Sequence, residues 1–329
     1  MPLIAEQKRE RTIDHRAARQ IAARREDGRF PEAGRSFRMI GRFRFWLSDK
    51  KSRQRCAKRP NDVPFDVLKI DRIVQTLPPE LVKLGLEGGI ALVALNDPSK
   101  RNALGLAMFE ALEQAIGRIG DDESIHVVLL HGEGAAFCAG FDLHAVVHDA
   151  KLMSQFIQRL SVLNQTLRQM RQVVVASVQG AAIAGGCALL SACDFVFVAD
   201  DAKLGYPVHR IGISPAVTIP MLQQAIGSGA ARSLLMGGEL ISGAQALRLA
   251  LATHLSQSGE SVFDDALAFC KALLEKGRHA LAATKAWLNE LDGSMDDSRF
   301  ERPVKASSKI SESSEARAML AQWHSKLSG

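Results

Sequence analysis

Apolar runs of strand type alternate with helical patterns along the middle of the chain. The runs LVKLGLE and IALVALN flank Gly88 and Gly89 and predict a β-hairpin, with which the folded part begins near Leu81. Further strands are predicted at residues 127–131, 173–178 and 195–199, and helices at residues 104–119, 151–171 and 186–193. Strands that alternate with helices indicate an α/β fold with right-handed crossovers.

From about residue 216 the pattern is wholly helical. Helices are predicted at residues 218–225, 230–236, 243–251, 262–275, 279–291 and 311–327. We therefore divide the chain into an N-terminal extension (1–77), an α/β core (78–270) and a C-terminal helical region (271–329).

Two glycine-marked stretches follow two of the predicted strands. Residues 135–144 contain AFCAGFDLH, and residues 179–194 read QGAAIAGGCALLSACD. In the second stretch a helical pattern without a breaker starts at Gly185, so its N–H is one of the unpaired amides of a helix N-terminus. If the turn at Gly140 and Phe141 brings a second amide to the same point, the pair would hold negative charge on a carbonyl oxygen. The alternative is two tight strand-to-helix turns whose glycines only permit close packing.

Four ordered motifs carry a resemblance to a known family. They are ALNDPSKRNAL, AFCAGFDL, VQGAAIAGGCALLSACD and LGYPVHRIGISP, and in this order and spacing the chain resembles the crotonase superfamily, the enoyl-CoA hydratase/isomerase family. The resemblance runs from about Leu81 to the C-terminus. It implies a spiral of ββα turns followed by a helical region that packs on neighbouring subunits as a homotrimer or homohexamer.

The resemblance also implies a ligand and a chemistry. The backbone amides of Phe141 and Gly185 match the two donors that hold the thioester carbonyl of an acyl-CoA and stabilise an enolate, as in enzymes of fatty acid metabolism. Coenzyme A is then part of the substrate, and neither a tightly bound cofactor nor a metal ion is expected. The residues that match the coenzyme-binding segment are Lys100, Arg101, Asn102, Ala103, Leu104 and Ala139.

Two departures from the family pattern bear on the reaction. Hydratases of the family use two glutamates to activate water, and at the matching positions this chain has Ala188 and Val208. Neither side chain transfers a proton. We therefore expect a lyase or isomerase reaction, decarboxylation of a malonyl-type thioester included, in place of standard hydration. A binder of CoA thioesters without catalysis, or an assembly subunit of the same fold, is the alternative.

Three side chains are candidates for handling protons. His209 follows Val208 and titrates near neutrality, although chain neighbours usually point to different sides. Tyr206 is the only tyrosine, and the alternative for it is packing beneath the pocket. His144 follows the first glycine turn and would reach the substrate or a coenzyme phosphate. For Asp142 we expect a local cap, and for Cys187 a small core residue.

The excess positive charge of the protein lies in residues 1–60, here called the basic leader. The net charge is +6, but residues 1–60 hold 18 Lys and Arg against 7 Asp and Glu, a net of +11, and the remainder carries −5. This leader has little apolar periodicity and is predicted to be disordered, with one possible helix at residues 12–25. Three interpretations of this segment stay open: an arm that binds nucleic acid or a membrane surface, a transit peptide, and a segment without a specific role. Nucleic acid is the less favoured partner, because no nucleic-acid-binding module accompanies the positive charge.

Cysteine usage and hydropathy restrict the compartment. Five cysteines occur without CxxC or Cys/His metal spacing, which suits reduced thiols. No run approaches the roughly 20 apolar residues of a membrane span, and no signal-peptide pattern opens the chain. The sequence predicts a cytoplasmic protein.

Overall fold

The structure, a computed structural model, describes residues 75–76, 81–149 and 151–328. The predictions for the basic leader, including the helix at residues 12–25, therefore lie outside the described residues. One described piece falls inside the predicted extension: Gln75 and Thr76 form strand β1 and pair with Leu84 and Lys83. The fold accordingly starts before the predicted boundary at residue 77.

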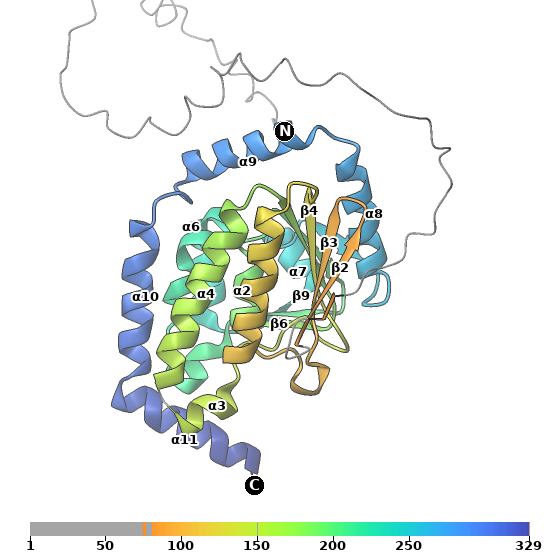
Figure 1. Cartoon of the computed structure of the whole chain (residues 1–329). Helices are drawn as coiled ribbons and strands as arrows, with labels where there is room; N and C mark the ends of the chain where they lie inside the picture. The colour runs from red at the N-terminus through yellow and green to blue at the C-terminus, as the bar shows by residue number, and fades with distance from the viewer. Residues whose placement is uncertain (1–74, 77–80, 150, 329) are drawn as a thin grey trace, which may run out of the picture. The chain divides into compact units, whose positions relative to one another are not determined.

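A seven-stranded sheet forms the centre of the fold (Figure 1). Its order is β1-β2-β3-β4-β5-β7-β10. The first three strands are antiparallel, and from β3 onward every neighbouring pair is parallel. The strands are β1 (Gln75–Thr76), β2 (Val82–Glu87), β3 (Ile90–Leu95), β4 (Val127–Gly132), β5 (Val173–Val178), β7 (Phe195–Ala199) and β10 (His254–Ser256). All six residues of β3 and of β5 are buried, as expected for strands covered on both faces.

A second, smaller sheet has three strands. It consists of β6 (Ala181–Ile183), β8 (Lys203–Gly205) and β9 (Leu240–Ser242), in the order β6-β8-β9. The chain thus passes from a strand of the large sheet to a strand of the small one and then into a helix, as in β5-β6-α5. This repeat is the predicted spiral of ββα turns.

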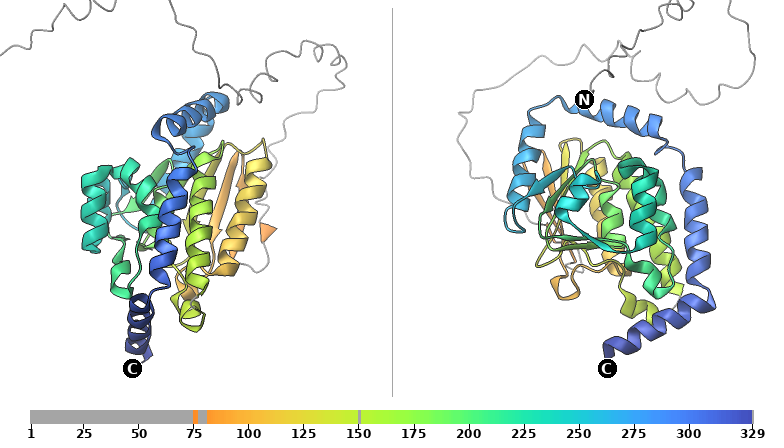
Figure 2. Two further views of the ribbon diagram at one scale, coloured as in Figure 1. Left: turned by 90° about the vertical axis from the view of Figure 1, so that its left-hand side faces the viewer. Right: turned by 180° about the vertical axis from the view of Figure 1, so that it is seen from behind.

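Helices cover the large sheet on two sides (Figure 2). The helices α2 and α4 pack on each other, and α2 also contacts β2 and β3, whereas α8 contacts β4, β5 and β7. The bounds are α2 (Leu106–Asp121), α3 (Leu143–His148), α4 (Lys151–Gln169), α5 (Gly185–Leu190), α6 (Ile219–Gly237), α7 (Gly243–Arg248), α8 (Val262–Leu274), α9 (Arg278–Asp292), α10 (Ser298–Ser311) and α11 (Ser314–Ser328), with short 3-10 helices at η2 (Pro98–Lys100), η3 (Pro207–Ile211) and η4 (Ala216–Thr218).

The C-terminal third contains both agreements and corrections. The predicted helices at 218–225 and 230–236 are the two halves of α6, which is broken at Gly227 where φ is 77°. The prediction of a wholly helical pattern after residue 216 was wrong, because β9 and β10 add short strands to the two sheets. Helix α10 was missed, since Pro303 inside it breaks the helical signal. The predicted domain boundary at residue 270 falls inside α8.

A buried ion pair anchors α9 to the sheet. The Nζ of Lys285 donates to Oδ2 of Asp194 at 2.7 Å and to the carbonyl oxygens of Leu167 and Gln172. Only 6% of the Lys285 side chain is exposed. Beyond α9, helix α10 runs along α4, and α11 contacts α3 and η3 (Figure 1). Among the described helices, none has the length and apolar character required to cross a membrane.

Candidate active site

The two glycine-marked turns meet at one place in the fold. The N–H of Leu104 donates to the carbonyl of Gly140 at 2.7 Å, and the N–H of Asp142 donates to the carbonyl of Leu104 at 3.1 Å. Cys138 is bonded in the same way to Ala181 and Ile183 of β6. The first turn is therefore fixed between the loop that precedes α2 and the strand that precedes α5.

This pairing directs the Phe141 amide away from Leu104. In a parallel bridge of this kind, Leu104 uses the carbonyl of Gly140 and the N–H of Asp142, so the N–H of Phe141 points to the opposite side of the backbone. Gly185 is the first residue of α5, where an amide has no partner inside the helix. An ideal Cβ on Gly140 would lie 3.6 Å from the nitrogen of Gly185. Within the described residues, neither the Phe141 nor the Gly185 amide donates a turn or loop hydrogen bond.

Glycine is required where the two turns approach each other. Gly140 has φ of 94°, and a Cβ there would lie 2.9 Å from the carbonyl oxygen of Ile183. A Cβ on Gly186 would lie 2.4 Å from the carbonyl oxygen of Cys138. Ala184, just before α5, has φ of 50°, a left-handed value that a residue with a Cβ adopts at a cost of about 1–3 kcal/mol. Strain and close backbone contact thus coincide at the predicted oxyanion site.

An aromatic cluster holds the Phe141 side chain. Its ring centroid lies 5.5 Å from that of Phe156 on α4 and 6.2 Å from that of Phe109 on α2. Phe109 and Phe156 are fully buried. Since the ring is packed between two helices, the Phe141 backbone cannot turn freely, and its amide keeps its direction.

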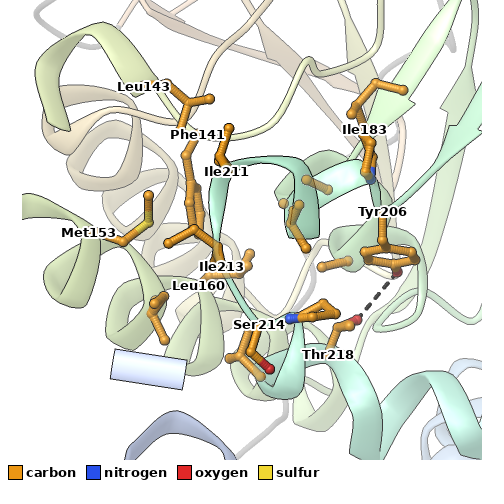
Figure 3. A pocket seen from close by; sticks show the side chains of 18 of the residues that line it. Phe141, Leu143, Met153, Leu160, Ile183, Tyr206, Ile211, Ile213, Ser214 and Thr218 are labelled. Carbon is orange, nitrogen blue, oxygen red and sulfur yellow. Dashed lines mark hydrogen bonds between the residues drawn. The ribbon is translucent and has the colours of Figure 1, made fainter. Parts of the chain in front are cut away.

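A cavity of about 360 Å³ opens beside these two amides (Figure 3). Its lining is almost entirely apolar, and both Ala188 and Val208 contribute to it. Among the described residues, no Asp, Glu, His or Lys lines it, and Arg210 is the one charged residue that does. The lining residues are Ala139, Phe141, Leu143, Met153, Ile157, Leu160, Ile183, Ala184, Gly185, Ala188, Tyr206, Pro207, Val208, Arg210, Ile211, Ile213, Ser214, Pro215, Val217, Thr218 and Trp323.

A second hollow of about 520 Å³, here called the basic groove, adjoins the cavity. It is lined by Ser99, Lys100, Arg101, Ala103, Ala139, Phe141, Asp142, Leu143, His144, Ala145, His148 and Trp323. Four residues line both spaces: Ala139, Phe141, Leu143 and Trp323. A molecule with an apolar end and an anionic end would therefore cross from one space to the other at Phe141.

The six residues predicted to bind the coenzyme divide into two groups. Lys100, Arg101, Ala103 and Ala139 line the basic groove. Asn102 and Leu104 are completely buried and do not line it. Their side chains therefore do not reach the groove, and coenzyme binding by the loop as a whole stays a prediction.

The Asn102 side chain serves the fold. Its Nδ2 donates to the carbonyl oxygens of Glu133, Ala136 and Phe137, and its Oδ1 accepts from the N–H of Asp97. It ties the loop of the basic groove to the strand end before the first glycine turn. Asn102 therefore holds the loop in place, and its buried side chain does not line the basic groove.

Asp142 has the capping role that the sequence predicted. Its Oδ1 accepts from the N–H of Ala145 at the start of α3. Its Oδ2 also accepts from Nζ of Lys100 at 3.0 Å, and this hydrogen bond raises the pKa of Lys100 above its ordinary value. Lys100 remains largely exposed and charged at the groove.

Of the three candidate proton handlers, only Tyr206 lines the cavity. Its hydroxyl lies 3.3 Å from Oγ1 of Thr218 (Figure 3), and burial raises its pKa well above the ordinary value, so the phenol is neutral. His209 is exposed and does not line the cavity, which places it away from the two amides. His144 lines the basic groove and its ring packs against Trp323 and His324.

Cys187 was predicted to be a core residue, whereas Trp323 and Arg210 were not among the predicted site residues. Cys187 is fully buried and burial raises its pKa to about 12, as expected of an inert core thiol. Sequence reasoning missed Trp323, which α11 brings to both spaces, and Arg210, which follows His209 in the fourth motif. In the described part of the chain, no group of three or more His, Cys, Asp or Glu is arranged to hold a metal ion.

Comparison with known proteins decides the family. The sequence model described as enoyl-CoA hydratase/isomerase matches residues 85–321. The chain belongs to the enoyl-CoA hydratase/isomerase family. The match spans every element from β3 to the first half of α11, so it includes both glycine turns and every lining residue of the two spaces except Trp323.

Individual members of the family are moderately similar to this chain in sequence and in structure. A Thermus thermophilus protein with an enoyl-CoA hydratase name is 33% identical over 213 residues, covering 63% of this chain and 83% of that protein. The crotonyl-CoA hydratase of Syntrophomonas wolfei is 29% identical over 217 residues, covering 64% and 82%. Among solved structures, an enoyl-CoA hydratase/isomerase from Mycobacterium paratuberculosis is 26% identical, with a TM-score of 0.66 and coverage of 74% of this chain and 98% of that one. The crotonase fold predicted from the four motifs is confirmed.

Proposed function

We propose that this family member is an acyl-CoA-processing enzyme that stabilises a thioester enolate with the backbone amides of Phe141 and Gly185. The observation that carries the proposal is the convergence of the two glycine turns, which places both residues on the wall of one apolar cavity. Two fixed donors aimed at a developing oxyanion typically supply on the order of 3 kcal/mol each to the transition state. Because the donors are main-chain groups, they survive most side-chain changes.

The basic groove supports coenzyme A as the carrier of the acyl group. The groove presents Lys100, Arg101 and two histidines, which suit the phosphates of a nucleotide. The cavity presents apolar side chains, which suit an acyl chain. Their shared wall contains Phe141, so the thioester that joins the two halves of an acyl-CoA would lie at the amide pair.

The lining of the cavity argues against standard hydration. Adding water to an enoyl thioester needs groups that take a proton from water and give one to carbon. Ala188 and Val208 line the cavity at the positions where the resemblance expects glutamates, and no carboxylate or imidazole from the described part of the chain lines it. Tyr206 is a neutral phenol already paired with Thr218, which makes it a poor base.

Decarboxylation is the reaction that this lining favours. When a malonyl-type thioester loses CO₂, the electron pair of the breaking carbon–carbon bond passes into the enolate, so no base is required. The enolate is then protonated at the α-carbon, by water or by the Tyr206 hydroxyl. Isomerisation, which needs one group to move a proton between carbons, remains second.

We further propose assembly through the C-terminal helices into a homotrimer or homohexamer. On α9 and just after it, four large apolar side chains are exposed, among them Leu291 at 81% and Trp287 at 68%. The other two are Leu288 and Met295. Clustered exposed apolar groups of this size mark an interaction surface.

We also propose a cytoplasmic location. The described cysteines are buried free thiols, which suit a reducing compartment.

The test is product analysis with the full chain. The protein is incubated in D₂O with methylmalonyl-CoA and, separately, with crotonyl-CoA, and the thioesters are analysed by mass spectrometry. We expect propionyl-CoA carrying one deuterium from the first and little 3-hydroxybutyryl-CoA from the second. Rapid hydration of crotonyl-CoA would overturn the choice of reaction. Tight binding of both thioesters without turnover would instead support a non-catalytic CoA-thioester binder.

A further inference from the structure

Arg210 stands apart from every other residue of the cavity wall. Of the described residues that line the cavity, it is the only one with a permanent charge, because burial keeps Tyr206, the other ionisable one, neutral. Among the described residues of this wall, which encloses about 360 Å³, Arg210 is therefore the one that can offer a charged partner to an anionic group.

Arg210 has no internal partner in the described part of the chain. No carboxylate there lies within ion-pair distance of its guanidinium, whereas Arg159 and Arg168 are each paired with acidic side chains. An arginine that is not used by the fold is free to bind an anion from outside.

The backbone that carries Arg210 is fixed. Arg210 lies in η3, which starts with Pro207 and ends at Gly212, whose φ of 71° closes the turn. An ideal Cβ on Gly212 would lie 2.6 Å from Cα of Ala316, so α11 presses directly on this turn. The backbone of Arg210 is thus held at the wall of the cavity by the same helix that supplies Trp323.

We propose that Arg210 recognises a carboxylate on the acyl group, so that the substrates are thioesters of short dicarboxylic acids. This inference rests on the proposed acyl-CoA function and names its substrate class. A guanidinium binds a carboxylate through two parallel N–H···O bonds, a geometry that a methyl terminus cannot offer.

The position of Arg210 favours an acyl carboxylate over a coenzyme phosphate. The phosphates have their own cationic site in the basic groove, and Arg210 does not line that groove. It lines the space that receives the acyl chain. Because Arg210 is exposed at the rim, water screens the pair, and we expect a preference of about fivefold, the upper end for exposed ion pairs.

The experiment compares two thioesters with the same number of acyl carbons. Succinyl-CoA ends in a carboxylate and butyryl-CoA in a methyl group, and dissociation constants are measured by calorimetry for the full chain, Arg210→Gln, Arg210→Lys and the control Arg248→Gln. Arg248 is an exposed arginine on α7 that lines neither space. We expect the wild type and R248Q to prefer succinyl-CoA by about fivefold, R210Q to lose the preference, and R210K to keep part of it.

Each other outcome overturns the inference in a recognisable way. If R210Q weakens both thioesters equally, Arg210 contacts the coenzyme portion. If R210Q matches the wild type with both, Arg210 is a solvated rim residue. If neither thioester binds the wild type, the proposed acyl-CoA function fails, and the substrate class fails with it.

Discussion

The ring of Phe141 lies directly against the position where a side chain on Gly185 would begin. An ideal Cβ on Gly185 would stand 3.1 Å from Cε1 and 3.2 Å from Cδ1 of Phe141. The two residues predicted to supply the amides of one oxyanion site are therefore coupled through a side chain as well as through their backbones. Glycine at position 185 lets the Phe141 ring pack on Phe109 and Phe156.

The first prediction concerns Gly185→Ala. The added methyl meets side-chain atoms of Phe141 and Leu104 and no backbone atom, and a small shift of these side chains makes room for it, so we expect the protein to fold with a loss of about 1 kcal/mol. The displaced Phe141 ring shifts its own amide, and we expect turnover of the thioester to fall at least tenfold. Steady-state kinetics and urea unfolding measure the two effects separately.

Gly186→Ala is the matched comparison. A Cβ at Gly186 would meet the carbonyl oxygen of Cys138 at 2.4 Å, and backbone cannot move aside as a side-chain end can. We expect this variant to lose several times more stability than Gly185→Ala. Equal stability of the two variants would contradict the packing described here.

The second prediction concerns Trp323, which lines both the cavity and the basic groove. With Trp46 and Trp287 replaced by phenylalanine, Trp323 is the single tryptophan of the chain. The fluorescence emission of Trp323 should change on titration with an acyl-CoA, because the bound molecule would lie beside the indole ring.

Trp323→Ala should also weaken acyl-CoA binding about tenfold, since a large aromatic contact is lost. Trp287→Phe, on the exposed side of α9, serves as the control and should bind as the wild type does. An emission spectrum that does not respond to a saturating acyl-CoA would refute the placement of the substrate.

The third prediction concerns the buried pair of Lys285 and Asp194. Lys285→Met removes the cation and leaves the Asp194 carboxylate, which is only 18% exposed, without its charged partner. We expect a loss of about 3 kcal/mol in the free energy of unfolding, measured in urea. The double variant Lys285→Met with Asp194→Asn should recover part of this loss, because no isolated charge remains. A double variant less stable than the single one would show that the ion pair is not the source of the effect.

The fourth prediction is a loss of stability at alkaline pH. Burial raises the pKa of Cys138, Cys187, Cys193 and Cys270 from an ordinary value of 9.0 to about 12. The unfolded chain releases these protons above pH 9 while the folded chain keeps them, so ionisation favours unfolding. Their contribution is intact below about pH 9 and falls as pH rises toward 12, by up to about 1.4 kcal/mol per thiol and pH unit.

Urea unfolding between pH 7 and pH 11 tests this trend. The slope above pH 9 should become shallower in Cys270→Ala, which removes one of the four thiols. In addition, native Cys56→Ser protein should react slowly with Ellman's reagent at pH 8 and release four thiols when unfolded. Rapid reaction of the folded variant would contradict the burial of these side chains.

Much of the core could be predicted from local patterns. The strand ends of β5 and β7 agree with the predicted ranges, and β4 is longer by one residue. Long apolar runs of this kind are buried on both faces, and their pattern does not depend on distant partners. The small sheet could not be predicted, because β6, β8 and β9 have three residues each and exist only through pairing across the chain.

The sequence by itself determined the family, the two glycine turns and the absence of a carboxylate at positions 188 and 208. It determined these because they depend on residue identity and short-range spacing. Tertiary structure decided which side chains reach the site: it turned His209 away from the cavity, buried Asn102 behind the groove, and brought Trp323 and Arg210 to the wall. The cavity is built from residues 139–218 together with residue 323, and the direction of each side chain there is set by packing between elements far apart in the chain.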